Sequence, residues 1–180
     1  MKLELSMWYK ILAPRSVVLV STVNNDGVSN AAPFSFVMPV STEPPMIAFA
    51  SDPGHHTVKN IKMTGDFVVN IPGADILDKL WTCAKSFAYG VSEIEKAGLT
   101  EEKSENVKSP RIKESIGFFE CKLSRIEDIG DHVLIIGDVL LAGVKDKFFS
   151  GGKYLIKKAN PLIHIGGPEF ALIGEIVKNR

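Results

Sequence analysis

Cysteine is scarce in this chain, and so are the short motifs of several large enzyme classes. Only Cys83 and Cys121 are present, far apart and without Cys-x-x-Cys spacing, so we expect two buried thiols, not a disulfide or metal site. The sequence lacks a His-x-x-x-His pair, a Gly-x-Gly-x-x-Gly loop and a Gly-x-Ser-x-Gly turn. These absences argue against zinc hydrolysis, a Rossmann nucleotide site and an α/β-hydrolase nucleophile. We therefore expect no metal, and chemistry carried by a bound cofactor.

Net charge and long apolar runs are also missing. The chain has 21 basic and 21 acidic residues, so no positive field indicates nucleic acid or an anionic membrane. No apolar run has the length of a membrane span, and residues 1–6 lack the apolar core of a signal peptide. We expect a cytoplasmic protein with a single domain over residues 1–180. The near-zero charge favours self-association.

Runs of β-branched and apolar residues predict a succession of strands. They cover residues 15–23, 28–34, 46–50, 67–71, 119–123 and 133–144, and residues 170–177 are a candidate for closing the sheet. Turns are predicted at residues 24–27, where Asp-Gly favours a hairpin, and at 129–132. Few helices intervene, so the order of elements predicts a mainly β fold, an antiparallel sheet or barrel with a few flanking helices.

Two helices and one loop complete the prediction. The first helix covers residues 57–64, with Thr57 as its N-cap and Gly65 in the left-handed position after its end. The second covers residues 74–84, with an apolar face at helical spacing. That face consists of Ile76, Leu77, Leu80, Trp81 and Ala84. The charged stretch 98–111 is expected to be a surface loop, and the acidic side chains are expected to be solvated.

The start of the first helix is the best candidate for binding an anion. Its first backbone N–H groups have no partner within the helix, and the helix dipole adds positive potential. Thr57 adds a hydroxyl, and His55 and His56 can donate hydrogen bonds or carry charge. Residues 29–36 form an extended apolar run that could hold a flat ring. Together these environments suit a phosphorylated aromatic cofactor, although a plain helix cap and an ordinary strand explain each block taken alone.

Two other histidines differ in their settings. His132 follows Gly-Asp at a predicted turn, where a histidine can bind substrate, move a proton or simply be exposed. His164 lies among apolar residues, which is more typical of a hydrogen-bonded structural histidine.

Four blocks, in their order and spacing, resemble the flavin reductase-like family. They are residues 29–36, which resemble an Asn-x-Ala-Pro-Phe-Ser block, residues 44–49, residues 56–61 with 65–70, and the Gly-Asp-His turn at 130–132. The resemblance covers about residues 14–144. It implies FMN bound in a split β-barrel, usually in a homodimer.

The resemblance also implies roles for matching positions. Beside the isoalloxazine ring and ribityl chain it implies Asn30, Ala31, Ala32, Ser35 and Phe36. At the ribityl phosphate end it implies Ala50, Ser51, His55, His56, Thr57 and Asn60. Lys85, Ser86 and Phe87 match a segment near the flavin. His132 is the catalytic candidate, facing the ring where a nicotinamide docks.

One departure from the family pattern concerns charge. The family commonly has Lys or Arg with Asp just before the Thr, where this chain has His55 and His56. A histidine can lose its charge near neutral pH, whereas Lys and Arg keep theirs. We therefore predict that FMN affinity falls as pH rises through the range where these histidines lose protons.

The resemblance favours a homodimeric FMN-binding oxidoreductase that takes hydride from NADH or NADPH. The acceptor would be free flavin, ferric iron or another molecule. An FMN-bearing electron carrier reduced by a partner redox protein uses the same pocket and remains an alternative. A β-barrel binding module without flavin is the third interpretation of the sequence.

Overall fold

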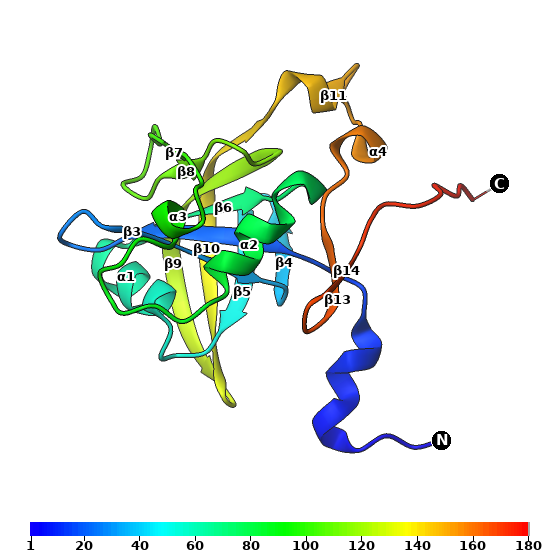
Figure 1. Cartoon of the computed structure of the whole chain (residues 1–180), viewed down its shortest axis with the longest axis horizontal. Coiled ribbons are helices and arrows are strands. Elements are labelled where there is room, and N and C mark those ends of the chain that lie inside the picture. The colour runs from blue at the N-terminus through cyan, green and yellow to red at the C-terminus, as the bar shows by residue number, and fades with distance from the viewer. Residues whose placement is uncertain (180) are drawn as a thin grey trace.

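The computed structural model describes residues 1–179, and one antiparallel sheet of seven strands dominates it (Figure 1). In spatial order the strands are β3 (Ser29–Phe34), β2 (Val18–Val23), β6 (Asp66–Ile71), β9 (Gly117–Ile129), β10 (His132–Val144), β5 (Pro45–Ser51) and β4 (Val37–Thr42). Every neighbouring pair is antiparallel. The predicted mainly antiparallel β fold is thus confirmed.

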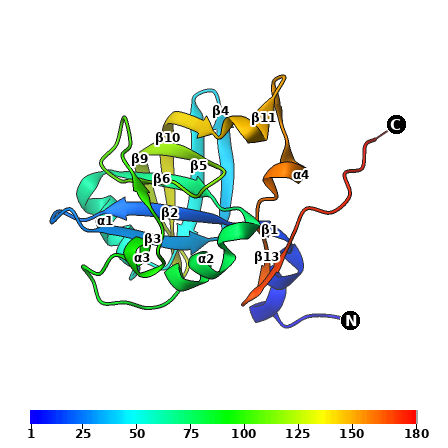
Figure 2. The same cartoon turned by 45° about the horizontal axis from the view of Figure 1, so that its top comes forward.

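A bend at Ser35 and Phe36 closes this sheet into a barrel. β3 and β4 lie at opposite edges of the sheet, yet these two residues alone join them along the chain. The N–H of Ala50 on β5 donates to the carbonyl of Phe36 at 2.9 Å. Figure 2 shows β4 and β5 turned across β2 and β3. The closing corner therefore lies within one of the predicted cofactor-binding blocks.

Both faces of β2 are buried, which explains its uninterrupted apolar sequence. Val18 and Val20 belong to the core inside the barrel, together with Phe49. Leu19 belongs to a second core outside the barrel, where Leu80 packs against it. Burial on two faces removes the alternation of a half-exposed strand.

Short strands and helices surround the barrel. The strands are β1 (Arg15–Ser16), β13 (Ile163–Gly166) and β14 (Glu169–Ala171) in one sheet, with the pairs β7 (Glu101–Glu102) and β8 (Arg111–Ile112), and β11 (Phe149–Ser150) and β12 (Lys153–Tyr154). The α-helices are α1 (His56–Thr64), α2 (Leu77–Cys83), α3 (Glu93–Lys96) and α4 (Ile156–Ala159). The 3₁₀ helices are η1 (Leu5–Leu12), η2 (Ala74–Ile76) and η3 (Asp146–Phe148). The N-terminal η1 projects from the barrel (Figure 1).

Two strand predictions differ from the structure. Strand β4 was not predicted, because it is a mostly exposed edge strand whose pairing shifts between Pro39 and Ser41. Residues 170–177 do not close the barrel. Strand β14 ends at Ala171 and pairs with β13 outside the seven-stranded sheet.

The second predicted helix is divided into η2 and α2, and its buried face is narrower than expected. Ile76, Leu80 and Cys83 are buried. Trp81 is 41% exposed, and Ala84 is also exposed. The predicted apolar face is therefore wrong at these two positions, whereas the predicted Leu77 is partly buried and packs against the second core beside the three buried side chains.

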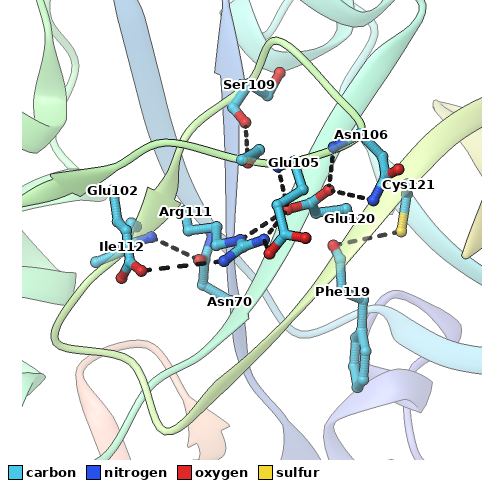
Figure 3. Close-up of polar contacts among 11 residues, drawn as sticks. Asn70, Glu102, Glu105, Asn106, Ser109, Arg111, Ile112, Phe119, Glu120 and Cys121 are labelled. Atoms are coloured by element: carbon cyan, nitrogen blue, oxygen red, sulfur yellow. Dashed lines mark hydrogen bonds and ion pairs between the residues drawn. The ribbon is translucent and has the colours of Figure 1, made fainter. Parts of the chain in front are cut away.

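The charged stretch 98–111 is mostly exposed, as predicted for a surface loop, but it carries the short strand β7 and is anchored to the barrel at its buried positions. The fully buried carboxylate of Glu120 on β9 accepts hydrogen bonds from the N–H groups of Glu105 at 2.9 Å and Asn106 at 2.7 Å. It also accepts one from Arg111 Nε at 2.7 Å (Figure 3). Burial alone would raise the pKa of Glu120, but these donors outweigh it and lower the pKa. A buried charge is tolerated because it is paired in this way.

A second carboxylate fixes the same stretch. Asp66, on β6, accepts the N–H groups of Lys108 and Ser109 at 3.1 Å and the Ser109 hydroxyl at 2.6 Å. Asp66, Glu93 and Glu120 are all buried, so the prediction that the acidic side chains are solvated is wrong for these three. Local patterns missed them because the groups that satisfy them lie elsewhere in the sequence.

Cys83 and Cys121 are buried free thiols, as predicted. Burial, followed by the charge of a nearby carboxylate, raises the pKa of each thiol to about 12. Within residues 1–179, no three His, Cys, Asp or Glu side chains gather into a possible metal site. No helix in that part of the chain is long and apolar enough to cross a membrane.

Candidate functional site

A cleft of about 340 Å³ lies between β3, the start of α1 and the segment that follows α2. Eight predicted cofactor-binding residues line it: Asn30, Ala32, His55, His56, Thr57, Lys85, Ser86 and Phe87. This volume is within the range of about 300–1,000 Å³ that is usual for small-molecule sites. The fold thus brings three separate stretches of sequence to one cleft.

Helix α1 presents its N-terminus to this cleft. The helix begins at His56, with His55 as an N-cap whose side chain makes no capping hydrogen bond. The prediction of Thr57 as the N-cap is therefore wrong by two residues. Gly65 ends the helix in the left-handed conformation, at φ 74°, as predicted. The first-turn N–H groups lack partners within the helix, which suits them to an anion.

Asn30 connects the cleft wall to this helix. Its Oδ1 accepts the hydroxyl of Thr57 at 3.1 Å, and its Nδ2 donates to Glu93 at 2.8 Å. Thr57 is 1% exposed. Because its hydroxyl proton is directed to Asn30, the donor that Thr57 can offer to an anion is its backbone N–H.

Glu93 is the charged cleft residue that sequence reasoning missed. It is 4% exposed and begins α3, where Ser92 accepts the N–H of Glu95 as an N-cap. Burial raises the pKa of its carboxyl, partly offset by hydrogen bonds that include the one from Asn30. His56 Nδ1 lies 3.9 Å from the carboxylate. No local sequence signal separates Glu93 from the exposed Glu95, because its burial comes from packing of α3 on β3.

Three predicted residues support the walls without lining either this cleft or the groove described next. Ala31 is fully buried in the second core. The Ser51 hydroxyl is 3.1 Å from His55 Nδ1. Asn60 donates to the hydroxyl of Thr22 at 3.0 Å. All three therefore lie within or beside the elements that form the walls of the site.

A larger groove of about 960 Å³ lies on the other side of the β3–β4 bend. Its lining includes four predicted residues: Ser35, Phe36, Ala50 and His132. His132 Nδ1 lies 2.7 Å from Asp131 Oδ1, and this hydrogen bond lowers the pKa of Asp131. The ring centroids of His132 and Phe36 are 5.8 Å apart. With Nδ1 engaged by Asp131, Nε2 is the ring nitrogen left for a ligand.

A small pocket of about 210 Å³ lies between the two. It shares Pro33 and Phe34 with the cleft and Ser35 with the groove. His164 borders it, with Nδ1 at 3.0 Å from the Ser35 hydroxyl and Nε2 at 3.1 Å from the carbonyl of Gly167. These contacts confirm the prediction of a hydrogen-bonded structural histidine. Three neighbouring hollows with shared lining residues therefore follow the end of β3, from the start of α1 to His132.

The family model named Flavin reductase like domain matches residues 12–167. The chain belongs to the flavin reductase-like family. A protein of Methanothermobacter thermautotrophicus is 39% identical over 176 residues, covering 93% of this chain and 83% of that protein. A flavin reductase of Pseudomonas putida is 28% identical over 153 residues, covering 81% of this chain and 86% of that protein.

Several solved structures share the fold. Nitrilotriacetate monooxygenase component B from Bacillus cereus has a TM-score of 0.91 at 28% identity, covering 99% of this chain and 95% of that chain. The flavoredoxin of Desulfovibrio vulgaris has a TM-score of 0.86 at 22% identity, covering 99% and 97%. A flavin reductase-like structure from Shewanella frigidimarina with a split barrel domain has a TM-score of 0.89 at 21% identity, covering 99% and 93%. The predicted split β-barrel is confirmed.

Proposed function

We propose that this flavin reductase-like protein binds FMN, takes hydride from NADH or NADPH, and passes electrons to free flavin, ferric iron or another acceptor. The supporting observation is the row of neighbouring hollows along the end of β3, which places a helix N-terminus near an aromatic-lined groove. The family assignment supports FMN as the cofactor. When bound, FMN supplies the hydride and electron transfer, and the protein supplies binding and orientation.

In this proposal, the cleft holds the phosphate end of the cofactor. The N–H groups of His56 and Thr57 donate to the phosphate, and the exposed Lys85 adds a cation. The hydrogen bond from Asn30 to Glu93 fixes the amide so that its oxygen faces Thr57. Glu93 is thereby a positioning residue, although its charge opposes the phosphate. The cleft chemistry fits an anion held by backbone donors with limited cationic help.

The groove receives the ring and the nucleotide donor. Ser35 and Phe36 border the ring, and His132 faces the donor with Nε2 while Asp131 holds Nδ1. Hydride transfer requires no protein base, so His132 positions the nicotinamide or screens developing charge. We expect His132→Gln to raise KM for the nicotinamide nucleotide more than it lowers kcat.

We also propose a homodimer. Helix η1 has no buried residue, and its Ile11 is 76% exposed. On the edge strand β4, Val40 is 43% exposed. Neither side chain lines the groove, and exposed apolar surface of this kind is typical of a self-association face. Light scattering on the purified protein measures its mass in solution. We expect twice the mass of one chain, and the mass of a single chain would contradict the homodimer.

Steady-state oxidation of NADH and NADPH, with FMN and ferric chelate as acceptors, tests the activity. Turnover with either nucleotide is the expected result. If turnover is absent but the FMN-loaded protein accepts electrons from a reduced redox protein, the electron-carrier alternative replaces the reductase.

A further inference from the structure

Arg15 is a half-buried cation that lacks a carboxylate partner. Among residues 1–179, no Asp or Glu oxygen lies within 4.0 Å of its guanidinium. Its contacts are Nη1 to the Tyr9 carbonyl at 3.1 Å, Nε to the Ser35 hydroxyl at 3.5 Å and Nη2 to His164 Nδ1 at 3.5 Å. Two of these are long and all are to uncharged acceptors. By contrast, Arg111 is satisfied by carboxylates.

Aromatic side chains line the same groove as this cation. The Arg15 guanidinium lies 5.5 Å from the centroid of Phe36, whose ring also lies 5.8 Å from that of His132. Tyr9 approaches Phe36 edge-on at 6.2 Å, and Trp8 also lines the groove. A guanidinium without a carboxylate partner, beside aromatic surface, is well suited to a ligand that offers both a ring and an anion.

We propose that Arg15 makes this groove a binding site for a flat aromatic molecule that carries an anionic group. The ring of the ligand packs against Phe36 and His132, and its anionic group receives the planar fork of Arg15. The inference rests on the proposed function, in which this molecule is an electron donor or acceptor. Two sources share this chemistry: an aromatic carboxylate as acceptor, and a nicotinamide nucleotide as donor.

Benzoate and its neutral isostere benzamide separate the anion from the ring. Each is titrated calorimetrically into the FMN-loaded protein, for the wild type, Arg15→Met and Arg15→Lys. The matched control is Arg125→Met, because Arg125 is exposed, pairs with Glu127 at 3.6 Å and does not line the groove. We expect Arg15→Met to weaken benzoate binding by about tenfold or more while benzamide changes by less than about twofold. Arg15→Lys keeps the positive charge and should therefore retain part of the preference for benzoate over benzamide.

A second arm distinguishes the two sources. KM is measured for NADH and for 1-methyl-1,4-dihydronicotinamide, which lacks phosphate. If the nucleotide is the ligand, Arg15→Met raises KM for NADH alone. If an aromatic carboxylate is the ligand, KM for NADH stays unchanged while benzoate affinity falls.

The proposal is overturned if Arg15→Met changes neither benzoate affinity nor KM for NADH. It is also overturned if Arg15→Met alters only the midpoint potential of FMN, because the guanidinium then acts on the flavin. A variant that alters only the oligomeric mass of the protein overturns it as well. Failure of the proposed function shows separately, as absent flavin absorbance. The benzoate and benzamide titrations are then made on the flavin-free protein. The same comparison applies: Arg15→Met should weaken benzoate binding much more than benzamide binding.

Discussion

Replacing Arg111 by Met should destabilise the protein strongly. Arg111 is 8% exposed, and its Nε and Nη2 lie 2.7 Å and 2.6 Å from Glu120 Oε1. Without it, the fully buried Glu120 keeps only the donors of Glu105 and Asn106. Removing one partner of a buried ion pair costs about 3–5 kcal/mol. For a chain of this length, that loss lowers Tm by roughly 10 °C.

The pH dependence follows from the lowered pKa of Glu120. A carboxyl whose pKa is lower in the folded than in the unfolded protein stabilises the fold above its unfolded pKa. That stability is lost as pH falls through the folded pKa. Arg111→Met removes one cause of the lowering, so wild type and variant should differ most near neutral pH and converge in acid.

Thermal unfolding followed by circular dichroism at neutral and acidic pH measures both effects. The control is again Arg125→Met, because the side chains of Arg125 and its partner Glu127 are 65% and 56% exposed. An exposed pair contributes little, so its loss should change stability by less than about 0.5 kcal/mol. If Arg111→Met lowers Tm by no more than Arg125→Met, the reasoning about the buried pair is refuted.

Three further predictions concern the cleft, the barrel core and the thiols. Glu93→Gln removes a negative charge from the cleft yet can keep the hydrogen bond to Asn30, so FMN affinity should rise by about fivefold. The predicted fall of FMN affinity with rising pH should also become weaker. A fluorescence titration of FMN that finds neither a higher affinity nor a weaker pH dependence would contradict this prediction. Gly137→Ala should cost about 1–3 kcal/mol by denaturant unfolding, because an added Cβ would overlap the ring of Phe67; full stability would contradict it. Cys83 and Cys121 should resist a thiol reagent at mildly alkaline pH until the protein unfolds, and rapid labelling of the native protein would contradict their burial.

Much of the fold was predictable because burial leaves a record in the sequence. Val18 and Leu19 pack into cores on opposite faces of β2, and such double burial produces the apolar run. The edge strand β4 carries no such run, since its residues are mostly exposed. The closing bend at Ser35 likewise has no local sequence signal, because it depends on which strands meet and not on its own residues.

The candidate site was predictable only in pieces. Gly65 marked the end of α1, but the grouping of the three cleft segments came from the family resemblance. Glu93 and Arg15 were missed because their partners are distant: Asn30 lies 63 positions from Glu93, and His164 lies 149 positions from Arg15. A charge whose burial depends on such partners is indistinguishable, in sequence, from a solvated one.

The visible spectrum of the purified protein tests the central claim most directly. It is recorded without oxygen after incubation with FMN and removal of excess flavin, and again after NADH or NADPH is added. The account predicts a yellow protein that bleaches rapidly with at least one nucleotide. A protein that retains no FMN contradicts the cofactor assignment, and a yellow protein that stays oxidised with both nucleotides contradicts the reductase.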